Sequence, residues 1–322
     1  MPISSEENSW RCHICHSKDK KVLAPLRGKD GGAYHAVRCL NCGLLSSDPV
    51  VRLTPEQIQE VYSKTYYDSG WCDGGLSYDA PEKIAAMEKE ARDQRQEIQR
   101  VTGLTTGSIL DVGCSDGRYL AEFKNAGWQT CGVEVSAYSA SQAREKYGLK
   151  VHCVSAEEID PSWGPFDLVR MKHCIEHLPD PRAVLARIAE ALGPGGFLVL
   201  DTDNAGGLRS TVENSIRAAL GRSAARSLVK AFTGRDLDSR YGRLSPPIHL
   251  YTFDLHTLGR LLGEFRLEIV HSLCPAQGHP VWFPQLHRYR CNKLELLFRL
   301  ADDLGGKFNR GEALVIFARK KS

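Results

Sequence analysis

Four cysteines near the N-terminus have the spacing of metal ligands. They form two C-x-x-C pairs separated by 23 residues: Cys12, Cys15, Cys39 and Cys42. Four thiolates at about 2.3 Å hold Zn²⁺ in a tetrahedron, and the metal then stabilises a segment too short to bury a large core. The spacing predicts an all-cysteine zinc site. The alternatives are a mixed site that uses His13, His16 or His35, and no metal at all.

The other seven cysteines have no such spacing, and we expect most of them to be small buried apolar side chains. They are Cys72, Cys114, Cys131, Cys153, Cys174, Cys274 and Cys291.

A glycine-containing turn follows the apolar run 109–112, which is typical of a strand. Gly113 and Gly117 can adopt backbone angles that other residues avoid, and they leave space for a ligand beside the main chain. The dinucleotide pattern G-x-G-x-x-G is not met, because Ser115 stands at its middle glycine. The turn therefore predicts a nucleotide-like ligand without a pyrophosphate.

Glu134 lies 23 residues after Asp111, at the end of another apolar run. An α/β fold places an acid at this spacing to bind ribose hydroxyls. Together these residues resemble motifs I (D-x-G-x-x-x-G) and II of the class I S-adenosylmethionine-dependent methyltransferases. The resemblance continues, in order, through Ser155–Glu157, Phe166–Val169, His173–Pro181 and Leu192–Leu200.

The resemblance implies an α/β fold with a seven-stranded sheet whose last strand is antiparallel, and S-adenosylmethionine bound at the carboxyl ends of the first four strands. In that arrangement Asp111, Gly113 and Gly117 hold the methionine part and Glu134 holds the ribose. The other implied cofactor-binding residues are Cys114, Val135, Ala156, Glu157 and His173, with Ala156 and Glu157 beside the adenine. Alternatively, Asp111 only holds the turn and Glu157 is a solvated loop acid.

Three histidines are candidate general bases for methyl transfer. His173 and His177 follow the fourth strand, beside the expected cofactor site, and they would share a face if this segment were helical. The pKa of histidine lies closest to neutrality, which suits a base. Glu176, between them, is an alternative, and His177 could instead merely close a turn with Pro179.

His249 and Tyr251 belong to a second candidate segment, Pro247–Phe253. It resembles the P-x-H-L-Y-x-F segment of bacterial zinc-ribbon methyltransferases that act on sugars and secondary metabolites. The resemblance implies that this segment enters the active site, and packing alone is the alternative. The chain departs from that group at residues 201–204, where a proline is usual before the asparagine, so the role of Asn204 in an acceptor pocket is in doubt.

The elements that position these residues divide the chain into three parts. We expect a zinc ribbon at 1–50, a helical linker with an acceptor-side loop at 51–105, and the methyltransferase domain at 106–322 with a basic, helix-prone insert at 205–248. Strands are expected at 42–45, 266–270 and 313–317, and helices at about 54–62, 81–100 and 254–262. The acceptor-side loop contains Tyr66 and Tyr67.

Composition narrows the function classes. The 322 residues are 42% hydrophobic and 25% charged, as in ordinary folded proteins. A net charge of +3 does not indicate a nucleic acid partner, and we expect the basic residues of 209–243 and 319–321 to be solvated. The sequence has no run of about twenty apolar residues, so we expect no membrane span. No secretory leader is visible, and we expect a cytoplasmic protein. The oligomeric state is not indicated.

The sequence thus predicts a Rossmann-like methyltransferase that uses S-adenosylmethionine and carries structural zinc. The expected acceptor is a hydroxyl or carbon of a small polar metabolite, such as a nucleotide-linked sugar or a natural-product intermediate. One alternative is an rRNA methyltransferase, since some of these also carry a four-cysteine ribbon. The other is a methyltransferase-like binding protein without activity, against which Asp111, Gly113, Gly117 and Glu134 argue.

Overall fold

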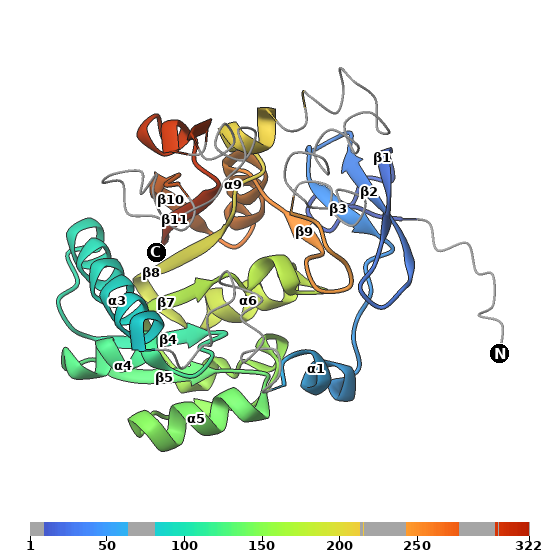
Figure 1. Ribbon diagram of the computed structural model, residues 1–322. Helices are drawn as coiled ribbons and strands as arrows, with labels where there is room; N and C mark the ends of the chain where they lie inside the picture. The colour runs from blue at the N-terminus through green and yellow to red at the C-terminus, as the bar shows by residue number, and fades with distance from the viewer. Residues whose placement is uncertain are drawn as a thin grey trace.

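A computed structural model describes residues 10–63, 81–212, 215, 243–276, 300–301 and 303–321. These residues form two β-sheets, one of seven strands and one of four. The larger sheet carries helices on both faces, and the smaller sheet lies beside one end of it (Figure 1). Most of the 205–248 insert, the Tyr66 and Tyr67 loop, Cys72 and Cys291 lie outside the described residues.

The seven-stranded sheet has the order β10-β11-β8-β7-β4-β5-β6. Its parallel part consists of β4 (Ser108–Val112), β5 (Gln129–Val133), β6 (Val151–His152), β7 (Phe166–Lys172) and β8 (Leu192–Asp203). At its other edge β11 (Ala313–Lys320) runs antiparallel between β8 and β10 (Leu267–Leu273). Strand order reverses between β4 and β7, which is where an open α/β sheet binds its ligand. The seven-stranded sheet with an antiparallel last strand is confirmed.

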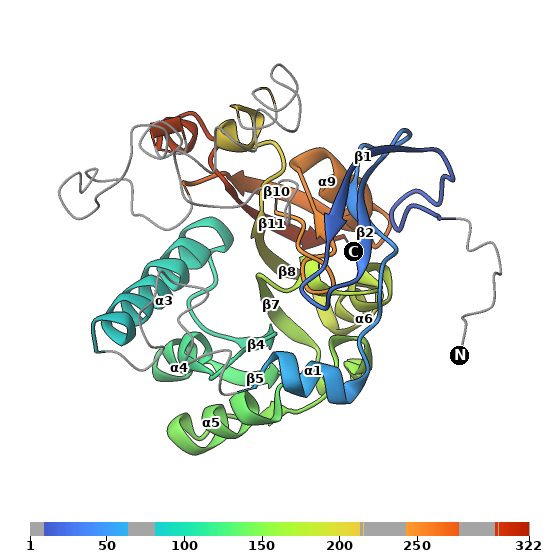
Figure 2. The same cartoon turned by 45° about the vertical axis from the view of Figure 1, so that its right-hand side comes forward.

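Two apolar layers hold helices against this sheet. On one face, α3 (Pro81–Thr102), α4 (Arg118–Asn125) and α5 (Ala137–Tyr147) contribute to a core that includes Ile98, Phe123 and Ala143. On the other face, α6 (Pro181–Ala191) and α9 (Leu255–Gly263) contribute to a core that includes Leu185 and Leu258. Figure 2 shows α3 and α6 on opposite sides of the central strands. None of the helices in the described part of the chain is both long and apolar enough to cross a membrane.

The smaller sheet belongs to the ribbon and has the order β1-β2-β3-β9. Its first three strands are β1 (Lys20–Arg27), β2 (Ala33–Cys39) and β3 (Leu45–Asp48). The fourth, β9 (Tyr251–Thr252), comes from the C-terminal half of the chain and pairs with β3. The ribbon sheet is therefore completed by a strand about two hundred positions away, which the sequence did not predict.

Several expected boundaries shift. The strand expected at 42–45 begins only at Leu45, because Gly43 turns the chain with a φ of +82°. The helix expected to end near 62 is α1 (Pro55–Val61), whose capping box joins Thr54 and Gln57. The expected helix at 81–100 and the two late strands are present and somewhat longer. Cys153 is exposed, contrary to the expectation for the scattered cysteines, whereas Cys114, Cys131 and Cys274 are buried.

Candidate cofactor and acceptor site

The glycine turn after β4 lies where the sequence places it. Gly113 has a φ of +74°, and its amide donates to the Val133 carbonyl across the sheet at 2.8 Å. Gly117 has a φ of +83°, and a Cβ there would lie 2.5 Å from the Leu149 side chain. Protein atoms therefore fill the space beside Gly117, so this glycine is needed for close packing of α4 against its neighbours.

Glu134 follows β5 and is held by the main chain. Its two carboxylate oxygens accept hydrogen bonds from the amides of Ser115 and Ser136, each at 2.8 Å. Only 6% of the residue is exposed, and burial raises its pKa although the two amides oppose that shift. Each oxygen retains a lone pair for a further donor, so the carboxylate is fixed in an orientation that fits two ribose hydroxyls.

The loop expected beside the adenine forms a short 3-10 helix, η1 (Ala156–Glu158), in which Ala156 packs partly buried against the core. One oxygen of Glu157 accepts from Arg52. The other, Oε1, is buried and has no hydrogen-bond partner among the described residues. A buried acceptor without a donor is costly, so this atom fits the exocyclic amine of an adenine. Glu134 and Glu157 together fit S-adenosylmethionine.

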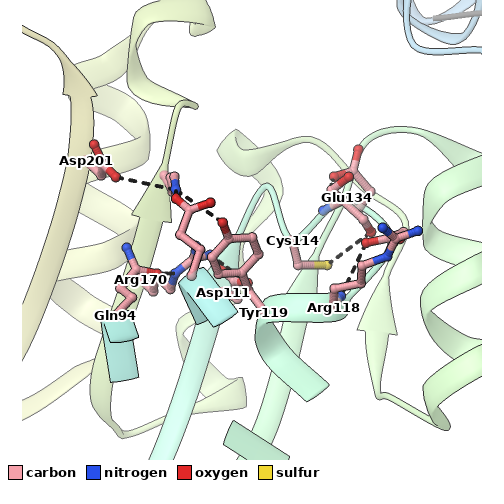
Figure 3. Close-up of polar contacts among 12 residues, drawn as sticks. Gln94, Asp111, Cys114, Arg118, Tyr119, Glu134, Arg170 and Asp201 are labelled. Atoms are coloured by element: carbon pink, nitrogen blue, oxygen red, sulfur yellow. Dashed lines mark hydrogen bonds and ion pairs between the residues drawn. The ribbon is translucent and has the colours of Figure 1, made fainter. Parts of the chain in front are cut away.

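Asp111 is fully buried and faces another strand. Its two carboxylate oxygens lie 2.8 and 3.0 Å from Nη1 of Arg170 on β7. Arg170 also donates from Nε to Gln94 of α3 at 2.7 Å and lies over the ring of Tyr119, 4.4 Å from its centre. Figure 3 shows this cluster between α3 and the sheet. Asp111 is thus bound to the adjacent strand and, through Arg170, linked to α3.

The charged row continues along the same face of the sheet. Lys172, two residues beyond Arg170, pairs with Glu90 of α3, lies 3.3 Å from the Tyr119 hydroxyl and lies 3.8 Å from the Asp201 carboxylate. Burial raises the pKa of Asp201. These residues were not among the predicted site residues, although the two basic residues at 170 and 172 on a largely apolar strand were a visible signal.

His173 leaves β7 with a φ of +46°, a strained conformation for a residue with a side chain. Its Nδ1 lies 3.1 Å from Oε1 of Glu176, which is fully buried and also accepts from Thr202 at 2.9 Å. Burial alone would lower the pKa of His173, but the Glu176 carboxylate outweighs it and raises the pKa to about 9. Burial likewise opposes ionisation of Glu176, yet the surrounding histidines lower its pKa to about 2.

His177 and His249 meet each other. Their rings pack edge to face with centres 4.4 Å apart. His177 Nδ1 lies 3.1 Å from the Ile248 carbonyl oxygen, which can only accept, so Nδ1 carries the proton and Nε2 is left as the basic nitrogen. His249 Nδ1 lies 3.8 Å from the Asp203 carboxylate.

His173 and His177 do not share a helical face, because the condition for it, a helix over this segment, is not met. The segment forms only a 3-10 turn, η3 (Ile175–His177), which begins after His173. His173 therefore faces Glu176, whereas His177 faces the segment that carries His249. The segment 173–177, called here the histidine segment, still borders the glycine turn 113–117, called here the cofactor turn. A Cβ on Gly113 would lie 3.3 Å from Cys174 Sγ.

Tyr251 and Asn204 have structural contacts. Tyr251 is fully buried, its hydroxyl donates to the Pro179 carbonyl at 3.2 Å, and its ring packs against His13 of the ribbon. Asn204 is buried, donates to the Gly311 carbonyl at 2.8 Å and accepts from the Gly206 amide at 2.9 Å. These contacts do not favour either side chain as a group that touches an acceptor.

The four ribbon cysteines converge. Their sulfur atoms all lie within 4.8 Å of one another, with Cys12 and Cys42 3.4 Å apart and Cys15 and Cys39 3.5 Å apart. A tetrahedron of sulfurs at the Zn–S distance has edges of about 3.8 Å, so the cluster fits one zinc ion. The Cys42 thiol lowers the pKa of Cys12, and the same contact raises the pKa of Cys42, so within this pair the thiolate forms on Cys12.

The ribbon is joined directly to the histidines. The Leu250 carbonyl accepts from the Ser47 amide of β3 at 2.8 Å, and the Leu250 amide donates to the Glu176 carbonyl at 2.9 Å. His249, one residue earlier, contacts His177. A single extended segment therefore pairs with the ribbon and carries one of the candidate site residues.

Known proteins are similar to part of this chain. Residues 85–272 match the family described as "Methyltransferase domain". A "Ubiquinone biosynthesis O-methyltransferase" of Bradyrhizobium sp. (strain ORS 278) is 37% identical over 30% of this chain and 40% of its own length. The protein with that name from Hydrogenovibrio crunogenus is 29% identical over 42% of this chain and 56% of its own length. The chain thus spans about half the length of these curated relatives.

Two solved structures share the fold at low identity. Magnesium protoporphyrin IX methyltransferase from Synechocystis PCC 6803, with bound S-adenosylhomocysteine, has a TM-score of 0.52 and 12% identity over 83% of this chain and all of its own. The second is a complex of the Haloferax volcanii Trm112 methyltransferase activator with a putative methyltransferase. It has a TM-score of 0.51 and 12% identity, and the match covers 76% of this chain and 96% of that chain. The family match covers more than half of the chain and includes the five parallel strands of the seven-stranded sheet, but not β11. The chain therefore belongs to the family of class I S-adenosylmethionine-dependent methyltransferase domains.

Proposed function

We propose that this chain transfers the methyl group of S-adenosylmethionine to a hydroxyl or carbon atom of a small polar metabolite. The contact between the cofactor turn and the histidine segment carries the proposal, since Gly113 and Cys174 are direct neighbours. It supports a site in which basic side chains lie beside the end of the cofactor that Glu134 does not hold. When bound, S-adenosylmethionine supplies an electrophilic methyl group, so the protein has to supply alignment and proton transfer.

On the cofactor side, Glu134 accepts the ribose hydroxyls and Glu157 accepts the adenine amine. In this proposal Gly113, which has a φ of +74°, and Cys114 belong to the turn that faces the methionine part. Asp111 acts through Arg170 and keeps α3 on the sheet. In this division of labour Asp111 positions the turn and does not itself contact the ligand.

On the acceptor side, His177 is the base. Its Nδ1 proton is committed to the Ile248 carbonyl, so Nε2 can accept the acceptor's proton. His173 has a different role, because a pKa of about 9 keeps it protonated at neutral pH. A protonated imidazole donates hydrogen bonds, and His173 can stabilise negative charge on an acceptor oxygen. Glu176 holds His173 from the buried side.

The acceptor is a small metabolite with hydroxyl groups, such as a nucleotide-linked sugar or natural-product intermediate. The relatives named O-methyltransferases support a hydroxyl acceptor. The ribbon and β9 segment form the acceptor side because His249 belongs to that segment. We also propose that the four cysteines hold one structural zinc ion, as the donor set and its geometry support.

Two measurements test the proposal. Calorimetry with S-adenosylhomocysteine is expected to show binding that weakens by about 1 to 3 kcal/mol in Glu134→Ala, the worth of charge-assisted hydrogen bonds. Glu145→Ala, at an exposed position on α5, is the matched control and is expected to bind like the parent. Methyl transfer from labelled S-adenosylmethionine is then compared among nucleotide-linked sugars, phenolic metabolites and rRNA. Labelling of rRNA alone would overturn the small-metabolite proposal.

A further inference from the structure

The short helix α1 is held in place without burying any side chain. It has seven residues, none of them buried. Helices of this length are marginal in water, and burial usually determines where they lie. Its capping box accounts for its start, where the Thr54 amide donates to Gln57 at 2.9 Å. Its apolar side chains, Ile58 and Val61, are only half-buried, so polar contacts contribute to the position of the helix on the domain.

Those contacts are to the loop that follows β5. The Gln59 side-chain amide donates to the Val135 carbonyl at 2.7 Å and accepts from the Ala137 amide at 2.9 Å. It thus bridges the main chain on both sides of Ser136. The Ser136 hydroxyl donates in turn to the Tyr62 carbonyl at the end of α1, at 2.8 Å. Both views show α1 beside the start of α5, where this loop ends (Figures 1 and 2).

The same loop fixes Glu134, because the Ser136 amide donates to its carboxylate at 2.8 Å. A second contact joins Arg52 to Glu157, in the loop that follows β6. The loops that follow β5 and β6 are called here the adenosine-side loops, because they carry the residues proposed to bind the ribose and the adenine. Residues 52–62 therefore contact the two loops that carry Glu134 and Glu157. The contacts of Gln59 and Arg52 are solvent-exposed, so they can break at a smaller cost than the buried core.

We propose that residues 52–62 form a clamp that keeps both adenosine-side loops in their binding conformation, with Gln59 as the positioning residue for Glu134. The inference rests on the proposed function, since it concerns the same cofactor site. The two hydrogen bonds of Gln59 remove freedom from residues 135–137 before the ligand arrives. A loop that is already ordered pays less on binding, so the clamp raises affinity and slows release.

The test is the binding of S-adenosylhomocysteine to the full-length protein. Gln59→Ala is expected to weaken binding roughly tenfold, mainly through faster dissociation, as the loss of two neutral hydrogen bonds implies. The amide proton of Ala137 is expected to exchange faster with solvent in this variant. Glu60→Ala removes an exposed side chain from the same helix and is the matched control, with parental affinity and release rate.

Gln59→Glu is the second variant, because a carboxylate still accepts from the Ala137 amide but cannot donate to the Val135 carbonyl. It is expected to weaken binding while the melting temperature stays near that of the parent, which keeps the test valid if Gln59→Ala folds poorly. Parental affinity and release rate in both Gln59 variants would overturn the clamp. Absence of S-adenosylhomocysteine binding to the parent would instead overturn the proposed function.

Discussion

The rings of His177 and His249 meet edge to face at 4.4 Å, although 71 positions separate the two residues. His177 belongs to the turn that ends the fourth parallel strand, and His249 lies just before the strand that completes the ribbon sheet. The contact therefore joins the carboxyl end of the parallel sheet to the ribbon, and both residues belong to the proposed acceptor side.

Replacing His177 by Gln is expected to lower turnover by about a hundredfold to ten-thousandfold, the usual worth of positioned proton transfer. Affinity for S-adenosylhomocysteine is expected to stay parental, because the cofactor contacts lie on Glu134 and Glu157. His173→Gln and His249→Gln are assayed alongside it with the same acceptor. A larger loss in either of these, with His177→Gln near the parent, would reassign the base.

The pKa of His173 is a direct readout of its pairing with Glu176. NMR titration of the parent is expected to give a pKa of about 9, and Glu176→Gln should move it back toward 6.5. Because the folded-state pKa is raised, His173 contributes stability that is complete below pH 6.5 and is lost as the pH rises through 9. The difference in melting temperature between parent and Glu176→Gln should therefore shrink across that interval. An unshifted pKa in the variant would show that Glu176 does not hold this charge.

Much of the cofactor half could be predicted because its residues are local in sequence. Asp111, Gly113 and Glu134 lie at strand ends, and the order of strands then brings them together. The β9 pairing was not predictable from pattern, since two residues at 251–252 are too few to show strand periodicity. Likewise, no periodicity distinguishes a 3-10 turn from a helix over 173–177, so the relation of His173 to His177 required coordinates. The partner of Asp111 could be recognised only once Arg170 was placed on the adjacent strand.

Loss of the metal is expected to change the surroundings of His177 and His249. Cys39→Ser should abolish stoichiometric zinc, as measured by metal analysis, and disorder the ribbon. Because Leu250 bonds to both β3 and Glu176, the ring signals of His177 and His249 should shift in the same variant. The affinity for S-adenosylhomocysteine is the control, and it should stay near that of the parent while the histidine signals shift. Retention of one zinc per chain in Cys39→Ser would place the ligands elsewhere.

Asp111→Asn tests whether the buried ion pair holds the fold. The substitution keeps the shape of the side chain but leaves the Arg170 guanidinium, only 3% exposed, without its counter-charge. Breaking one side of a buried pair costs about 3 to 5 kcal/mol, whereas an exposed pair contributes about 0.3 to 0.5 kcal/mol. Denaturant unfolding should therefore show a large loss for Asp111→Asn. Asp93→Asn, which breaks the exposed pair with Lys89 on α3, should change stability little.

The double variant Asp111→Asn with Arg170→Met separates the effect of the ion pair on stability from a direct effect of Asp111 on cofactor binding. Removing both charges leaves no unpaired ion, so the double variant is expected to be more stable than Asp111→Asn alone. A structural role for Asp111 further requires that the double variant regain affinity for S-adenosylhomocysteine along with stability. If stability returns and the affinity remains lost, the Asp111 carboxylate contacts the methionine part of the cofactor itself, and its role in the turn is secondary.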